Sequence, residues 1–153
     1  MKKIIMMLVG LCCISCLAFA AEPVDFTYKS IKIGDSYDQM TKALGETSTE
    51  IDKVIAGKEL TYYIYKDTRV GIVKADNSIA DIRIGDKTYE ARNGVKLGAT
   101  PYKILKEFGK ANRQHYYNQI CYIYQNPNDA KEKLILDITE GYLREIRITN
   151  LDE

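Results

Sequence analysis

The chain has 153 residues, 46% of them hydrophobic and 28% charged, which is typical of a globular protein and argues against a disordered chain. It carries 22 Lys and Arg residues against 21 Asp and Glu, and the net charge of +1 favours neither a nucleic acid nor an acidic polymer as a partner. One histidine and no tryptophan leave little material for a metal or acid–base site, so we expect no enzyme activity, no metal and no cofactor.

The N-terminal segment, residues 1–20, has the pattern of a signal peptide. Two lysines precede an uncharged run that ends at Leu17, and Ala18 and Ala20 are the small residues that a signal peptidase reads. The run is shorter than the about 20 apolar residues that span a membrane. We therefore expect cleavage after Ala20, no stable membrane span, and export to the periplasm or the extracellular space.

A lipoprotein signal that ends at Cys16 is the alternative interpretation of this segment. Ser15 is the small residue that such a signal has before its cysteine, but Cys13 stands where leucine is usual. A lipid on Cys16 would tether an otherwise soluble chain to a membrane surface.

Cleavage after Ala20 leaves Cys121 as the single cysteine of the exported chain, so no intramolecular disulfide forms. Cys121 lies in the strand-like apolar run 120–124, and free cysteines are commonly buried. We therefore expect a buried thiol. The alternative is a nucleophilic pair of Cys121 with His115, for which the sequence signals no orienting acid.

The remainder of the chain contains an internal repeat. Residues 31–36 align without a gap with residues 95–100, which lie 64 positions further along, and the sequence Ile-Arg-Ile recurs at the same spacing in residues 82–84 and 146–148. Between these blocks the sequence Tyr-Ile-Tyr occurs twice at a spacing of 59, so loop lengths differ there. The repeat predicts two units after the signal peptide, with the bounds 21–86 and 87–153.

Each unit begins with a predicted short helix. Ser36 is a candidate N-cap with a glutamine three residues later that completes a capping box, and Thr100 is the second cap, followed by Pro101 at the first helical position. Apolar residues recur at helical spacing up to Gly45 and Gly109, where a C-cap with positive φ suits glycine. We expect helices of about ten residues that depend on packing for their stability.

After each helix the period of the apolar residues changes to two, as in strands. The predicted strands are residues 60–65, 69–74 and 79–84 in the first unit and residues 119–125, 133–138 and 143–149 in the second. A further strand or a helix precedes each set, at residues 50–55 and 113–117. We therefore predict an α+β fold of two tandem units, each a short helix packed on a three- or four-stranded antiparallel meander.

Alternation along the strands assigns two faces to each meander. One face is suited to burial beneath the helix and carries Leu60, Tyr62, Ile64, Val70, Ile72, Ala80, Ile82, Ile84, Leu134, Leu136, Ile138, Ile146 and Ile148. The opposite face then carries the candidate partner-binding residues Tyr63, Tyr65, Tyr122, Tyr124, Arg83 and Arg147. Tyrosine and arginine are residue types that anchor protein interfaces. The same pattern is also typical of a solvated antiparallel face.

These features together resemble the β-lactamase-inhibitory-protein-like fold. The resemblance covers residues 31–149 and rests on the Gly-x-Ser/Thr segment, the helix that ends in glycine, the tyrosine-rich strand and the Ile-Arg-Ile end, each seen twice. The related small outer-membrane-assembly lipoproteins have a similar signature in a single unit. The resemblance implies two helix-plus-sheet units side by side, with one concave strand surface that carries the four tyrosines and grips a protein. Inhibitory proteins of this type have a disulfide in each unit and interface tryptophans, and the exported chain has neither.

The sequence thus favours an exported, non-enzymatic protein-binding module, and the resemblance implies an inhibitor-like action. Its partner would be another protein in the envelope or the extracellular space. The alternative is a role in cell-envelope assembly or as a scaffold, which a lipid on Cys16 would favour. The sequence identifies neither the partner nor the oligomeric state, and it leaves open whether the two units share one sheet.

Overall fold

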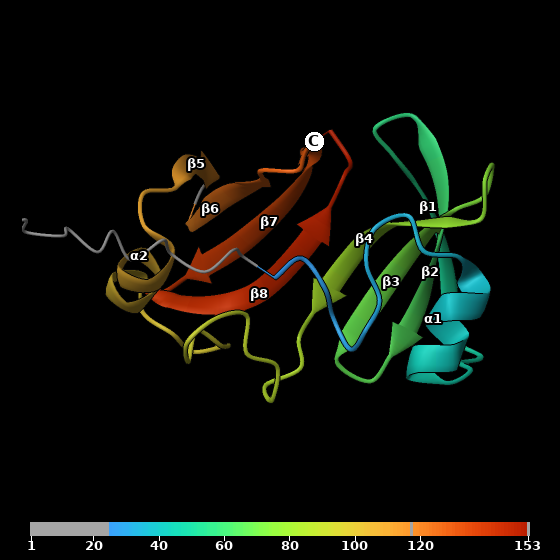
Figure 1. Ribbon diagram of the computed structural model, residues 1–153, viewed down its shortest axis with the longest axis horizontal. Coiled ribbons are helices and arrows are strands. Elements are labelled where there is room, and N and C mark those ends of the chain that lie inside the picture. Colours follow the sequence, from blue (N-terminus) through green and yellow to red (C-terminus); the bar gives the residue numbers. More distant parts are fainter. Residues whose placement is uncertain (1–24, 117, 153) are drawn as a thin grey trace, which may run out of the picture.

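The computed structural model describes residues 25–116 and 118–152, so the expected signal peptide, with Cys16 and Ala20, lies outside the described residues. Within them, two short helices and eight strands confirm the predicted α+β fold, and each helix precedes four strands (Figure 1). The helices are α1 (Tyr37–Leu44) and α2 (Pro101–Phe108). The strands are β1 (Glu50–Ile55), β2 (Lys58–Tyr65), β3 (Thr68–Val73), β4 (Ser78–Ile84), β5 (Asn112–Tyr116), β6 (Gln119–Asn126), β7 (Asp129–Thr139) and β8 (Tyr142–Thr149).

All of these strands belong to one antiparallel sheet, in the order β1-β2-β3-β4-β8-β7-β6-β5. In its middle β4 pairs with β8, so that Asp81 lies opposite Thr149 and Ile84 opposite Ile146. The two meanders therefore form one continuous sheet. The segments for which the sequence left strand or helix open are strands, β1 and β5, and they are the two edges of the sheet.

The helix ends follow the predicted capping chemistry. In α1 the Ser36 hydroxyl accepts a hydrogen bond from the Gln39 N–H and the Gln39 side chain accepts one from the Ser36 N–H, which is a complete capping box. Thr100 caps α2, and Pro101 is its first residue. Each helix has 8 residues, slightly fewer than expected, and ends at a glycine with φ of 85° or 78°. No helix among the described residues is long and apolar enough to cross a membrane.

One hydrophobic core lies between the sheet and a layer that covers one of its faces. This layer consists of α1, α2, the N-terminal segment that starts near Phe26 and the connection that contains Ala91 and Val95. Fully buried core residues from both halves of the chain are Ile31, Met40, Ile79, Ile82, Ile84, Ile104, Leu134, Leu136, Leu143, Ile146 and Ile148. Since both halves contribute to one continuous cluster, this core is shared between them.

A backbone contact of the first half recurs in the second half at positions 64 residues further along. The Gly34 N–H donates a hydrogen bond to the Ile79 carbonyl at 2.8 Å, and the Gly98 N–H donates one to the Leu143 carbonyl, also at 2.8 Å. In each half this bond ties the turn before the helix to the beginning of the fourth strand. The opposite face of the sheet, which neither helix covers, is called the open face below.

Candidate partner-binding face

The structure places the four candidate tyrosines on the helix side of the sheet, so the face predicted for them is wrong. Tyr63 lies opposite the core residue Val70 in the strand register, and Tyr124 lies opposite the core residue Leu134. Residues directly opposite in an antiparallel pair share a face. Accordingly Tyr122 and Tyr124 are only 3% and 8% exposed.

The hydroxyl groups of two of these tyrosines fasten the helices to the sheet. Tyr65 donates a hydrogen bond to the carbonyl of Gly45 at 3.0 Å, and Tyr124 donates one to the carbonyl of Gly109 at 3.1 Å. These carbonyls belong to the C-caps of α1 and α2, where helix carbonyls lack partners within the helix. Tyr63 supports α1 further, because its ring lies 5.0 Å from that of Tyr37.

Replacing Tyr124 by phenylalanine is expected to lower the free energy of unfolding by about 0.5–1.5 kcal/mol, because the Gly109 carbonyl loses its donor. Tyr65→Phe should have a smaller effect, since its hydrogen bond is exposed. Denaturant unfolding measures both, with Tyr102→Phe as the control because Tyr102 is 78% exposed. Unchanged stability of Tyr124→Phe would contradict the fastening role.

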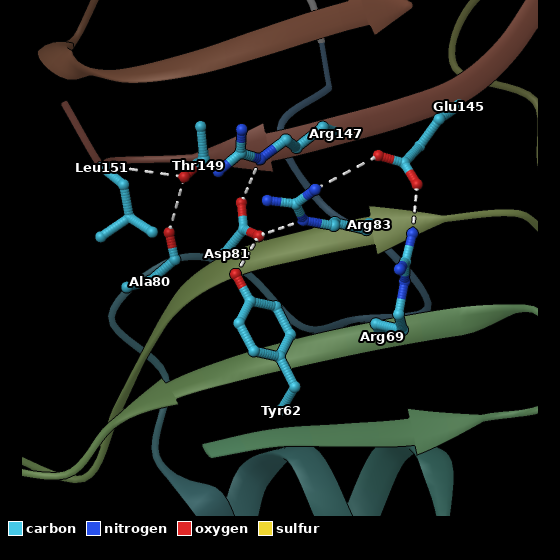
Figure 2. A network of polar contacts seen from close by, with 9 residues as sticks. All are labelled: Tyr62, Arg69, Ala80, Asp81, Arg83, Glu145, Arg147, Thr149 and Leu151. Carbon is cyan, nitrogen blue, oxygen red and sulfur yellow. Dashed lines mark hydrogen bonds and ion pairs between the residues drawn. The ribbon is translucent and has the colours of Figure 1, made fainter. Parts of the chain in front are cut away.

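The open face instead carries Arg83 and Arg147, as predicted, together with the carboxylate of Asp81. Arg83 and Arg147 lie directly opposite each other on β4 and β8. Asp81, two residues before Arg83, is fully buried. Both arginines donate to its carboxylate through Nε, at 2.8 Å in the case of Arg83 (Figure 2). The carboxylate therefore separates two like charges that would otherwise repel each other.

Tyr62 of β2 completes this network from the other side. Its hydroxyl donates to Asp81 Oδ2 at 2.6 Å, and burial, together with the adjacent carboxylate, raises the pKa of Tyr62. The ring lies over Gly71 of the neighbouring strand, where an added Cβ would come within 2.9 Å of the ring. Glycine at this position is therefore required for the ring to reach Asp81. Tyr62 was predicted on the helix side, and the structure corrects this.

The same correction applies to all of β2: its residues predicted on the helix side lie on the open face, and those predicted on the open face lie on the helix side. Leu60 and Tyr62 form a small second cluster on the open face with Val73, Ala80 and Leu151. Leu151 is only 2% exposed, and its N–H donates to Thr149 Oγ1, whose hydroxyl donates to the Ala80 carbonyl (Figure 2). The chain after β8 thus covers part of the open face and packs in the same cluster as Tyr62.

Two hollows lie on the open face, with Arg83 in the lining of both. The larger is a groove of about 800 Å³ over the second half, whose lining includes Arg83, Lys110, Gln114, Gln119, Cys121, Ile123, Lys133, Ile135, Asp137, Arg147 and Leu151. The smaller has about 90 Å³ and is lined by Ile51, Lys53, Tyr62, Ile64, Arg69 and Arg83. Between them Arg69 pairs with Glu145 at 2.6 Å, and Glu145 also lies 3.8 Å from Arg83 (Figure 2).

Cys121 lies in the floor of the groove and is 7% exposed, which confirms the predicted burial. Its thiol donates a hydrogen bond to Asp137 Oδ1 at 2.9 Å. Burial and this bond to a carboxylate raise the pKa of Cys121 to about 12. Since the thiolate is the reactive form, we expect the Cys121 thiol to be unreactive near neutral pH.

The pair of Cys121 with His115, the alternative to a buried thiol, does not form. Cys121 lies opposite Gln114 in the register of β5 and β6, whereas His115 lies opposite Ile120, so the two side chains are on opposite faces of the sheet. Among the described residues no group of three or more His, Cys, Asp or Glu side chains could hold a metal ion.

Iodoacetamide is expected to leave Cys121 of the folded protein unmodified at about pH 8, under conditions in which the denatured chain is alkylated completely. Intact mass before and after denaturation measures this difference. Rapid modification of the folded protein would contradict both the burial of the thiol and the raised pKa.

No protein-family model and no curated protein sequence matches this chain. Among solved structures, the chain resembles a DUF4309 family protein (YjgB) from Bacillus subtilis, with a TM-score of 0.57 and 17% identity over 79% of this chain and 82% of that one. An extracellular protein containing a SCP domain from Bacillus anthracis aligns with a TM-score of 0.48 and 10% identity, over 76% of this chain and 43% of that one. A Streptococcus mutans protein described as a "putative beta-lactamase inhibitor protein" aligns with a TM-score of 0.31 and 14% identity, over 85% and 91%. The likeness to the DUF4309 protein shows a shared fold and nothing about function.

Proposed function

We propose that the protein is an exported, non-enzymatic binding module that engages another protein with the open face of its sheet. The observation that carries this proposal is the one-sided construction of the molecule. Both helices, the N-terminal segment and the connection between the halves cover one face, while the other face holds a groove of about 800 Å³ and a set of charged side chains. Concave surfaces with a few fixed polar groups are typical of binding sites.

The network around Asp81 supports this role because it holds side chains in place before a partner arrives. Arg83 and Arg147 are bonded to a fully buried carboxylate, so little side-chain entropy is left to lose on binding. Arginine is enriched at the residues that dominate interface energies. Of the six candidate residues, Arg83, whose side chain is 24% exposed, is therefore proposed as the partner contact, and the buried Arg147 would support it through their shared carboxylate. Tyr63, Tyr65, Tyr122 and Tyr124 would contribute indirectly, by holding the helices on the sheet.

The same proposal includes the origin of the fold as two copies of one unit, residues 21–86 and residues 87–153. It is supported by the sequence repeat and by the backbone contact of Gly34 that recurs at Gly98. A joined pair of units gives a broader open face than one unit provides, since the groove and the smaller hollow lie over different halves.

Export is tested by the intact mass of the protein recovered from producing cells. A mass that corresponds to a chain starting at Ala21 supports cleavage after Ala20. A chain that starts at Cys16 and carries acyl groups would contradict this cleavage and favour the envelope-assembly or scaffold role.

Partner binding is tested by photo-crosslinking from two positions on opposite sides of the molecule. A photoreactive residue in place of Ile135, in the groove, should yield one protein adduct of defined mass from the exported-protein fraction. The same residue in place of Tyr102, which is exposed on α2, should yield none. The substitution Ile135→Glu should weaken capture of the same protein at least about tenfold, while Tyr102→Glu should leave it unchanged. Equal adducts from both positions would contradict the proposal, as would no adduct from either.

A further inference from the structure

The groove on the open face has a surplus of positive charge, although the chain as a whole is close to neutral. Among the described residues its lining contains four cations, Lys110, Lys133, Arg83 and Arg147, and one carboxylate, Asp137. A concave surface lined by one sign of charge concentrates the potential and attracts ligands of the opposite sign. The groove therefore favours negatively charged ligands although the net charge of the whole chain is close to zero.

Neighbouring carboxylates reduce this surplus without removing it. Asp81 lies beneath the arginines and balances one of their two charges. Glu145 lies 3.8 Å from Arg83, but its closer partner is Arg69 at 2.6 Å. Asp152 pairs with Lys133 at 3.2 Å but is 93% exposed, so water and salt screen this pair. Asp137 is already engaged as the acceptor of the Cys121 thiol. Within the described part of the chain Lys110, which is exposed just before β5, forms no ion pair with an acidic side chain.

The remaining lining is suited to a peptide chain rather than to a small inorganic anion. Carboxamides from the two outer strands line the groove, namely Asn112 and Gln114 of β5 and Gln119 and Gln125 of β6. A carboxamide both donates and accepts hydrogen bonds, which matches the alternating N–H and C=O groups of a peptide backbone. Ile123 and Ile135 are half-buried in the same lining and offer apolar contact to side chains. A volume of about 800 Å³ exceeds the needs of a phosphate ion and lies within the range of pockets that hold larger organic ligands.

We infer that this groove binds an extended, acidic peptide segment of the protein partner, with the segment's carboxylates directed toward Lys110 and Lys133. The inference rests on the proposed function and names the chemistry that the open face recognises. The ammonium groups supply the charge selectivity, and the carboxamides recognise the backbone. Because the lysines lie at the surface, the attraction should weaken as the salt concentration rises.

The test is an NMR titration of the isotope-labelled exported chain with three probes. The first is a short capped peptide of alternating glutamate and valine, the second is the same peptide with glutamine for glutamate, and the third is inorganic phosphate. The glutamate peptide should shift the backbone amides of β5, β6 and β7 and bind at least about tenfold more tightly than the glutamine peptide. Lys110→Glu should remove this preference. Lys96→Glu, an equal charge change at an exposed site in the connection between the halves, should retain it.

Three results would overturn the inference: equal binding of the two peptides, shifts confined to other parts of the molecule, or saturation of the same amides by phosphate with the affinity of the glutamate peptide. Its failure is distinguishable from failure of the proposed function. If Ile135 still crosslinks to a protein while the peptides show no charge preference, the binding face stands and the acidic segment does not. If neither position gives a protein adduct while the glutamate peptide binds, the acidic-peptide site in the groove is supported. Binding of a protein partner by the open face is then contradicted.

Discussion

Replacing Asp81 by alanine is expected to lower the free energy of unfolding by about 3–5 kcal/mol, because it leaves the charges of two arginines without their shared carboxylate. Asp81 is fully buried and Arg147 is 6% exposed, so water cannot replace the lost partner at Arg147 without opening the structure. Tyr62 loses the acceptor of its hydroxyl at the same time. Thermal unfolding followed by circular dichroism should show a fall in Tm of roughly 10 °C or more.

Asp52 provides the matched control for this substitution. It also accepts two side-chain contacts, a 2.7 Å hydrogen bond from Thr61 and an ion pair with Lys74, but its side chain is 64% exposed. Asp52→Ala should therefore change the Tm very little. The double variant Asp81→Ala with Arg147→Met should recover part of the loss, since the buried charge is removed with its partner. Equal effects of Asp81→Ala and Asp52→Ala would contradict the role assigned to the buried network.

The second large effect is expected at Ile148, in the middle of the shared core. Ile148 is fully buried and lies opposite Ile82 of β4 and Leu134 of β7. Ile148→Ala should lower the free energy of unfolding by about 2–5 kcal/mol through lost apolar contact and the cavity that remains. Because one core serves both halves, β2 and β3 should lose stability together with β6 and β7.

Native-state hydrogen exchange measures this coupling, because it reports the stability of each strand separately. The most protected amides of β3 and those of β7 should exchange faster in Ile148→Ala by the same factor. Ile51→Ala serves as the control, since Ile51 is an apolar residue on the edge strand β1 and is 47% exposed. Faster exchange confined to the second half would show that the halves unfold independently and would contradict the shared core.

Local features of the fold are predictable from the sequence because their causes are local. The caps at Ser36 and Thr100 depend on residues within one turn, and the structure has both. Period-two segments become strands for a similarly local reason. The pairing of β4 with β8 is different, since it joins segments far apart in the chain and no local pattern specifies it.

The predicted face of the tyrosines is wrong although a signal for the right face was present. Only two residues separate Tyr65 from Thr68, and a two-residue hairpin loop pairs these residues directly. Tyr63 then lies opposite Val70 and must share its face. Alternation alone could not decide this, because β2 has large side chains on both faces and both faces are packed.

The burial of Asp81 could not be predicted from its neighbours in the sequence. Asp-Ile-Arg in a strand is typical of alternating surface charge. The carboxylate is buried because Tyr62 comes from β2, Arg147 from β8 and the Leu151 cover from the segment after β8. These contacts appear only once the whole sheet is assembled.

The pairing of β4 with β8 also has a consequence for symmetry. Arg83 lies opposite Arg147, with Ile82 opposite Ile148 on one side and Ile84 opposite Ile146 on the other. Since the two strands are antiparallel and both read Ile-Arg-Ile, a two-fold rotation between the arginines exchanges one strand with the other. The pairing of β4 with β8 is therefore isologous, which means that the same sequence faces itself across a two-fold axis. This is the geometry of a symmetric dimer interface, here formed within a single chain. Asp81 breaks this symmetry, because one carboxylate from one side serves both arginines.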